Sequence, residues 1–162
     1  MEQLDHTNTL FSSDGIYADH AATAPIRPRA LQAMMETAAR YFGNPSSLHT
    51  PGQRAKDRLE EARESIASLL GASPREIYFT SGGTESDNWA LRAAAAVCAC
   101  RGKRGLLASS IEHHAVLHTL KRLETAGFPV TLLEVNRDGL IEPETLRRSL
   151  RPDTALVSVM HV

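Results

Sequence analysis

The chain has 162 residues, of which 42% are apolar and 23% charged, and its formal net charge is −1 at pH 7. This composition suits one globular domain, and the balanced charge gives no electrostatic footprint for nucleic acid or an anionic membrane. No run reaches the roughly 18 apolar residues of a spanning helix, and two cysteines are too few for a disulfide framework. The polar residues 1–15 resemble neither a secretory signal nor a transit peptide, so we expect a flexible lead-in and a cytoplasmic protein.

Two helices are predicted in the first half of the chain. Pro28 and Gly43 delimit a helix over 28–41, since proline is tolerated in the first helical turn and glycine ends a helix. A second helix is predicted from an apolar stripe with three- and four-residue spacing, closed by Gly71 just after the helix end. The stripe consists of Ala55, Leu59, Ala62, Ile66, Leu69 and Leu70.

The remainder of the chain alternates short apolar runs with helical segments. Strands alternating with helices indicate an α/β fold with a mostly parallel sheet and flanking helices. The chain closes on an apolar strand, and a buried parallel strand is seldom the last element of a domain, so we expect truncation after a fourth strand. An edge strand with a natural stop is the alternative. We expect strands at 77–80, 106–108, 130–135 and 155–160, and helices at 84–100, 112–126 and 143–150.

The segment TSGGTESDN at 80–88 stands between a predicted strand and a predicted helix. Glycines at such a turn allow a ligand to approach the backbone, and the free N–H groups of a helix start favour an anion. Ser81 and Thr84 add hydroxyl donors, so the segment is a candidate phosphate cradle. It lacks the lysine of a P-loop and the spacing of a dinucleotide fingerprint, so no nucleotide is implied. The alternative is a turn that merely uses glycine and a serine cap.

His113 and His114 open the helix after the second predicted strand, with Ser109 and Ser110 available as caps. The carboxyl ends of parallel strands are where α/β proteins form their sites. A histidine here could stack on a planar ligand or transfer a proton, and we assign His114 the role of an ordinary exposed residue. His118 lies four residues after His114, but no third ligand is evident, so we predict no metal site.

Four other residues with reactive side chains carry no chemistry in this interpretation. Cys98 and Cys100 are two apart in a predicted helix, so their side chains point to nearly opposite sides and cannot bridge locally. We expect both to be small core residues near the helix end, and neither to be a nucleophile. His20 and His49 lie in predicted loops, where histidine is more often a surface residue.

Five motifs follow one another along the chain: YADHAATAP at 17–25, FGNPSSLH at 42–49, REIYFTSGGTESDN at 75–88, SSIEHHAV at 109–116 and DTALVSVMHV at 153–162. In this order they resemble the amino-terminal part of a cysteine desulfurase, a pyridoxal-phosphate enzyme of the class-V aminotransferase family. The resemblance implies that residues 16–162 are part of the cofactor-binding large domain of a fold-type-I transferase. It also implies that the strand at 77–80 is separated in space from the other three by strands encoded later.

The resemblance further implies roles for individual residues. Gly83 and Thr84 match the pair that holds the cofactor phosphate through a backbone N–H group and a hydroxyl. His113 matches the histidine that stacks on the pyridine ring and helps in proton transfer. His20 with residues 21–23, and residues 44–49, match segments near the active-site mouth or the dimer interface. In the implied reaction the cofactor acts as an electron sink, and a cysteine thiolate attacks the sulfur of L-cysteine, leaving L-alanine and an enzyme persulfide.

The aspartate on the pyridine nitrogen, the cofactor-bearing lysine and the nucleophilic cysteine of the family all follow the matched segment, and Lys56, Lys103 and Lys121 lie outside every motif. We therefore expect the 162-residue chain to be inactive alone. The complete enzyme is expected to be a homodimer that passes sulfur to acceptor or scaffold proteins, in iron–sulfur cluster assembly or tRNA thiolation. The alternatives are another class-V aminotransferase or a selenocysteine lyase, a non-enzymatic remnant that pairs with a separately encoded half, and an unrelated phosphate-binding module.

Overall fold

The computed structural model describes residues 16–161, so the predicted lead-in at 1–15 lies outside the described residues. The chain divides into two compact units, one ending at Tyr78 and one beginning at Phe79. Among residues 16–161, no helix combines the length and the apolar character that crossing a membrane requires.

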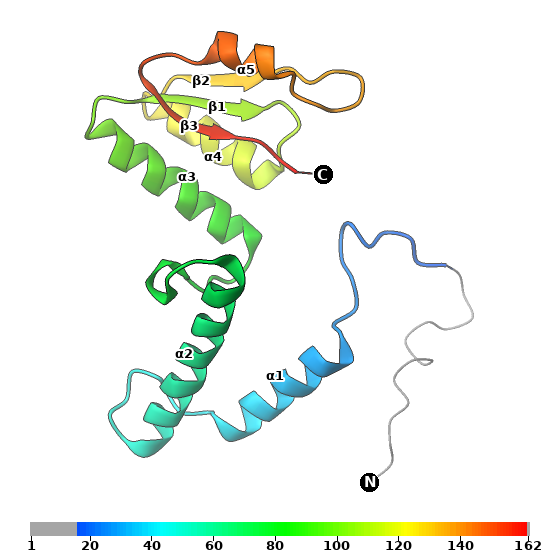
Figure 1. Ribbon diagram of the computed structural model, residues 1–162, viewed down its shortest axis with the longest axis vertical. Coiled ribbons are helices and arrows are strands. Elements are labelled where there is room, and N and C mark those ends of the chain that lie inside the picture. Colours follow the sequence, from blue (N-terminus) through cyan, green and yellow to red (C-terminus); the bar gives the residue numbers. More distant parts are fainter. Residues whose placement is uncertain (1–15, 162) are drawn as a thin grey trace. The chain divides into compact units, whose positions relative to one another are not determined.

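The first unit holds two α-helices and a short 3-10 helix (Figure 1). Proline occupies the first turn of α1, as predicted, and Gly71 ends α2 with a φ of 65°, a left-handed conformation that glycine adopts without strain. The second helix begins before the predicted stripe, because the ring of His49 caps it by accepting a hydrogen bond from the N–H of Gly52 at 3.3 Å. The elements are α1 (Pro28–Arg40), α2 (Thr50–Leu70) and η1 (Pro74–Glu76).

The apolar stripe of α2 locates the helix but not its buried face. Ala55 is buried as the stripe predicts, and Ala67, outside the stripe, is buried too. Leu69 and Leu70, also in the stripe, remain 87% and 69% exposed among the described residues. Spacing along one helix identifies an apolar face, whereas burial requires another element to cover that face.

The loop before α2 lies directly against the first turn of that helix. A Cβ atom added to Gly52 would lie 2.6 Å from the carbonyl oxygen of Ser47 and 2.7 Å from that of Asn44. A Cβ on Gly43 would meet the carbonyl group of Pro51 at an even shorter distance. Gly43 and Gly52 are therefore required for close backbone packing, beyond the helix-ending role that the sequence suggested for Gly43.

The second unit is a three-layer α/β structure, as predicted. Its described strands form a parallel sheet in the order β2-β1-β3. Helices α3 and α4 cover one face and α5 lies on the other (Figure 1). Right-handed crossovers require this arrangement, because the chain moves from β1 to β2 in one direction and returns past β1 to β3 in the other. The elements are α3 (Gly83–Ala99), β1 (Gly105–Ser109), α4 (His114–Thr125), β2 (Val130–Leu133), α5 (Pro143–Ser149) and β3 (Thr154–Ser158).

The core of this unit lies between the central strand β1 and the helices α3 and α4. Residues 106–109 of β1 are all buried, as expected for the middle strand of a parallel sheet covered on both faces. The core cluster comprises Leu106 and Ala108 from β1, Leu91 and Ala95 from α3, and Val116 and Leu120 from α4. These contacts hold α3 and α4 against the sheet.

The strand predicted at 77–80 is not formed. Ile77 has extended backbone angles, with φ −99° and ψ 123°, but no strand of the described part of the chain pairs with this segment. A strand needs a hydrogen-bonded neighbour, and β-type residues alone do not supply one. The resemblance drawn from the motifs implied such a separation of this segment from the other strands.

The two cysteines differ in environment. Cys98 is half-buried, and its Sγ lies 3.6 Å from the carbonyl oxygen of Ala155 in β3. Cys100 is exposed, so the prediction of a core position is wrong for this residue. The reason is that α3 ends at Ala99, and Cys100 is the residue that follows its last turn.

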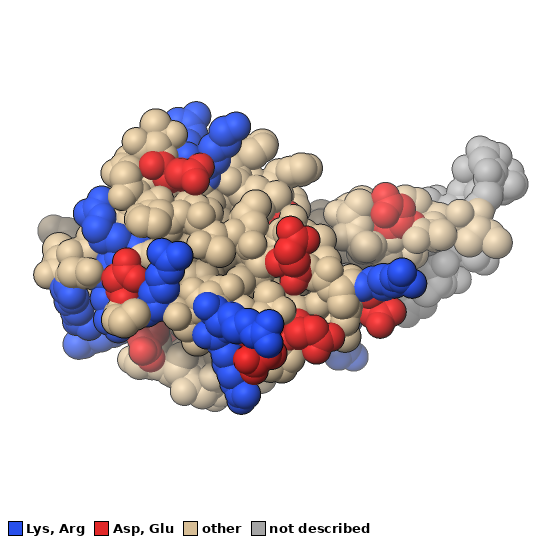
Figure 2. All heavy atoms as spheres, turned by 90° about the horizontal axis from the view of Figure 1, so that it is seen from above, with Lys and Arg blue, Asp and Glu red and all other residues tan. Residues whose placement is uncertain are grey.

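Charged side chains are distributed without a dominant sign on the face shown in Figure 2, where Lys and Arg lie among Asp and Glu. Several pair locally along one helix, such as Arg58 with Glu61 at 3.0 Å on α2. Exposed pairs of this kind contribute little to stability. This distribution agrees with the net charge of −1.

Candidate cofactor site

The amino terminus of α3 offers uncapped backbone N–H groups beside two glycines. Gly82 precedes the helix and Gly83 begins it, and no side chain of the described residues caps this end. A Cβ added to either glycine would meet no atom within 4 Å. The packing of the protein therefore does not require glycine at these positions, whereas a ligand that approaches the backbone closely would.

Ser81 does not serve as a free donor, contrary to our expectation. Its hydroxyl and its backbone N–H both donate to Oε2 of Glu85, each at 2.7 Å. These two hydrogen bonds lower the pKa of the Glu85 carboxyl below its usual range, because they stabilise the charged form. Ser81 is therefore not a cap that accepts from the helix. Of the two hydroxyl donors predicted for an anion, the one at Thr84 is the candidate that remains.

His113 is itself the cap of α4. Its Nδ1 accepts a hydrogen bond from the N–H of Ala115 at 3.1 Å. The predicted cap Ser109 instead accepts from the N–H of Ile111 at 3.2 Å, so the expectation of a serine cap is wrong. Serine and aspartate are the common caps, and a ring nitrogen in this role could not be inferred from helix-start statistics. With Nδ1 occupied as an acceptor, the neutral ring carries its proton on Nε2.

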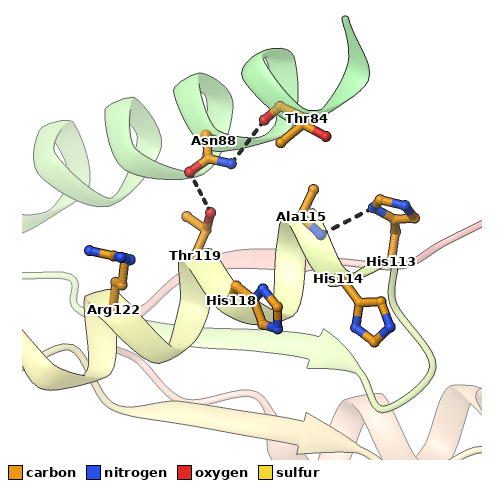
Figure 3. A pocket seen from close by; sticks show the side chains of 8 residues that line it. All are labelled: Thr84, Asn88, His113, His114, Ala115, His118, Thr119 and Arg122. Atoms are coloured by element: carbon orange, nitrogen blue, oxygen red, sulfur yellow. Dashed lines mark hydrogen bonds between the residues drawn. The ribbon is translucent and has the colours of Figure 1, made fainter.

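Thr84 and His113, two of the three residues assigned to the cofactor, line one cavity of about 320 Å³ in the second unit (Figure 3). The third, Gly83, precedes Thr84 in the first turn of α3. Among the described residues that line the cavity there is an arginine and there are three histidines, but neither Asp nor Glu, so the surroundings favour an anionic ligand. The lining residues are Thr84, Asn88, His113, His114, Ala115, His118, Thr119 and Arg122.

Two lining residues that the sequence interpretation missed connect the helices. Asn88 donates from Nδ2 to the carbonyl oxygen of Thr84 at 2.9 Å, and its Oδ1 accepts from the hydroxyl of Thr119 at 2.7 Å (Figure 3). Asn88 belongs to the quoted TSGGTESDN motif, and its position four residues after Thr84 was a usable signal. Thr119 is 31 residues further along the chain, and only the packing of α4 on α3 reveals it.

The other histidines singled out in the sequence are divided between the two units. His114 is exposed, as expected of an ordinary helix residue, but it also lines the cavity, with its ring stacked on that of His118 at 5.5 Å between centroids. Within residues 16–161 no group of three metal-ligating side chains gathers around them. His20 and His49 belong to the first unit, where His49 caps α2 and the ring of His20 contacts that of Tyr17.

These residues fit the pyridoxal phosphate that the motifs imply. The open space at Gly82 and Gly83, the uncapped helix start and the Thr84 hydroxyl suit a phosphate group. The imidazole of His113, oriented by its own cap, provides a flat surface for an aromatic ring in the same cavity. Anion binding and ring contact are thus available from the first turns of two neighbouring helices.

Comparisons with known proteins agree on one family. The aminotransferase class-V model matches residues 16–162. The chain is 46% identical over 153 residues to the cysteine desulfurase IscS of Methanosarcina thermophila, covering 94% of this chain and 38% of that protein. It is 50% identical over 150 residues to the cysteine desulfurase IscS of Azotobacter vinelandii strain DJ, covering 91% and 37%.

Solved structures give the same result. A NifS-like protein superposes with a TM-score of 0.80 at 41% identity, covering 85% of this chain and 38% of the other. DndA from Streptomyces lividans superposes with a TM-score of 0.75 at 44% identity, covering 91% and 41%. SspA in complex with cysteine reaches a TM-score of 0.80 at 39% identity, covering 88% and 41%. The chain thus spans about two fifths of the length of these relatives and has the fold of their corresponding parts.

Proposed function

We propose that this chain, which belongs to the class-V aminotransferase family, carries the phosphate-binding and ring-binding part of the pyridoxal-phosphate site of a cysteine desulfurase. One observation carries the proposal. Thr84 at the uncapped start of α3 and His113 at the start of α4 line the same cavity. The similarity to several proteins named cysteine desulfurase supports it.

The phosphate end of the site is assigned to Gly83 and Thr84. The N–H of Gly83 and the hydroxyl of Thr84 would donate to phosphate oxygens, and the dipole of the 17-residue helix α3 favours the negative charge. Glu85 nearby does not leave an unpaired carboxylate there, because its Oε2 is occupied by both donors of Ser81. Both hydrogen bonds fix the Glu85 carboxylate on Ser81 but leave its negative charge in place.

The ring end is assigned to His113. When bound, pyridoxal phosphate supplies an electron sink that weakens bonds at the α-carbon of an amino acid. His113 would stack on the ring and offer its Nε2–H as a hydrogen-bond donor, since Nδ1 is engaged by the N–H of Ala115. The neutral ring can take up a proton only at Nδ1, so proton transfer by His113 would require the cap of α4 to open.

The complete protein is proposed to convert L-cysteine to L-alanine and an enzyme persulfide. Support for cysteine as substrate comes from the names of the relatives and from the likeness to a structure of SspA in complex with cysteine. A homodimer, a cytoplasmic location, and sulfur transfer to acceptor or scaffold proteins for iron–sulfur clusters or tRNA thiolation belong to the same proposal. The 162 residues contain no lysine or cysteine within a motif matched to catalysis, so we propose no turnover by this chain alone.

The cofactor assignment is tested by titrating the full chain with pyridoxal phosphate, with NMR signals of Gly83, Thr84 and His113 as reporters. We expect Thr84→Val to weaken binding about tenfold, the effect of losing one hydrogen bond to a charged group. Thr125→Val is the matched control, because that hydroxyl bonds to the carbonyl of Lys121 at the far end of α4. Absence of binding by the unmodified chain, or equal loss in both variants, would overturn the assignment.

Turnover is tested separately by incubating the chain with L-cysteine and pyridoxal phosphate. We expect no release of alanine or sulfide, and no stoichiometric labelling of one lysine after borohydride treatment. Release of alanine above the rate of free cofactor would contradict the proposed inactivity and leave the cofactor assignment standing.

A further inference from the structure

A hydrogen bond between Asn88 and Thr119 joins the amino-terminal part of α3 to the body of α4. Around it, α3 and α4 contact each other through small and apolar side chains such as Leu91, Ala95 and Val116. The link is formed by half-buried Asn88 and by Thr119, which is 2% exposed. Polar groups buried to this degree are retained at a cost unless they are paired, so the pairing is a specific feature of this interface.

The donors and acceptors around Asn88 determine the orientation of its side-chain amide. Nδ2 donates to the carbonyl oxygen of Thr84, and Oδ1 accepts from the hydroxyl of Thr119. In the reverse orientation Oδ1 would face the carbonyl oxygen of Thr84, and two acceptors would oppose each other. The hydroxyl of Thr119 must therefore donate to Asn88, and the amide of Asn88 must donate to Thr84.

This link lies close to both ends of the candidate site. Asn88 is one turn after Thr84 and bonds to its carbonyl group, so it restrains the turn that carries the proposed phosphate donor. Thr119 is on α4, the helix that His113 begins and caps. Thr119 and His113 stand on one continuous helix, so the Asn88–Thr119 bond connects the turn of Thr84 to the helix that His113 begins (Figure 3).

We infer that Asn88 is a positioning residue, which uses its paired hydrogen bonds to Thr84 and Thr119 to hold the phosphate end and the ring end of the cofactor site at a fixed separation. The inference rests on the proposed function. It assigns no contact between Asn88 and the cofactor. Loss of the link should therefore lower the affinity for a ligand that spans both ends of the site. It should leave unchanged the affinity for a ligand that occupies only the phosphate end.

The inference is tested in the full chain with two ligands, of which one would occupy only the phosphate end of the site and the other would occupy both ends. Inorganic phosphate probes the α3 end alone, and pyridoxal phosphate probes both ends. For Thr119→Val, which removes the hydroxyl with little change in shape, we expect the affinity for pyridoxal phosphate to fall about tenfold and the affinity for phosphate to stay within about twofold. The ligand-induced NMR shift of the His113 ring should shrink in the same variant.

Four further variants separate positioning from simple stabilisation. Thr119→Ser keeps the hydroxyl and should restore most of the affinity for pyridoxal phosphate. Asn88→Ala with Thr119→Val should weaken binding no more than Asn88→Ala alone, because both changes remove the same link. Thr125→Val is the control on the same helix and should change neither affinity.

The outcomes distinguish this inference from the function on which it rests. If the unmodified chain binds pyridoxal phosphate and Thr119→Val binds it equally well while only melting at a lower temperature, the link is structural and the inference fails alone. Equal losses for phosphate and pyridoxal phosphate would also overturn it. If the unmodified chain binds no pyridoxal phosphate, the proposed function fails and the inference fails with it.

Discussion

Glu85 accepts hydrogen bonds from both the hydroxyl and the backbone N–H of Ser81, at 2.7 Å each. The contact connects the loop before α3 to the first turn of that helix. Thr80 and Ser86 add a second connection, with 2.7 Å between their hydroxyl oxygens. The two residues that precede Gly82 are thus both held by side chains from the first turns of α3.

The Ser81–Glu85 contact predicts a pH-dependent contribution to stability. The two donated hydrogen bonds lower the pKa of the Glu85 carboxyl in the folded state. The contribution is therefore fully present above the unfolded-state pKa and is lost as the pH falls through the folded-state value. The difference in unfolding free energy between the unmodified chain and Glu85→Gln, measured in urea, should be largest near neutral pH and shrink on acidification. A difference that grows on acidification would contradict the assignment.

Gly52→Ala is predicted to destabilise the first unit. The added Cβ would lie 2.6 Å from the carbonyl oxygen of Ser47, so the backbone must shift, at a cost of about 1–3 kcal/mol. Gly83→Ala is the matched substitution at a helix start where the Cβ meets nothing, and it should change the unfolding free energy by less than about 0.5 kcal/mol. Urea denaturation of both variants checks the contrast. Equal costs would show that packing does not explain the glycine at 52.

Leu106→Ala is predicted to weaken the second unit strongly. Leu106 is fully buried in the central strand, and its truncation should cost about 2–5 kcal/mol through lost burial and a residual cavity. Leu132 in the neighbouring strand β2 is 50% exposed, so Leu132→Ala should cost about 1 kcal/mol or less. Chemical denaturation of the two variants should separate them clearly. A similar loss in both would place the core elsewhere.

Glu112→Gln is predicted to raise stability at pH 7. Glu112 is buried, and its Oε1 has no hydrogen-bond partner among the described residues. Glutamine keeps the shape and can turn an amide N–H group toward this position in place of an oxygen without a donor, so we expect a gain of about 1 kcal/mol. Glu134→Gln, at an exposed position, is the control and should change stability by less than about 0.5 kcal/mol. A loss of stability specific to Glu112→Gln would indicate that the carboxylate has a favourable partner.

Sequence patterns correctly predicted those elements whose formation depends on neighbouring residues along the chain. The apolar run at 106–108 lies inside β1, and Pro28 begins α1 as proline in a first turn should. The alternation of strands and helices predicted a parallel sheet, and the sheet is parallel. The segment at 77–80 has the same β-type composition but no partner, which composition cannot reveal.

The sequence by itself determined the helices, three of the four predicted strands, the α/β class and the motifs that carry the family resemblance, because these depend on spacing and on residue types. Only the tertiary structure decided that Thr84 and His113 share a cavity, that histidines cap α2 and α4, and that Asn88 bonds to Thr119. The shared cavity and the Asn88–Thr119 bond join residues that are distant along the chain, and their geometry follows from the packing of α3 and α4 on β1, which no local pattern encodes. The two caps are local contacts, but they use a ring nitrogen, which the usual preferences at helix starts do not indicate.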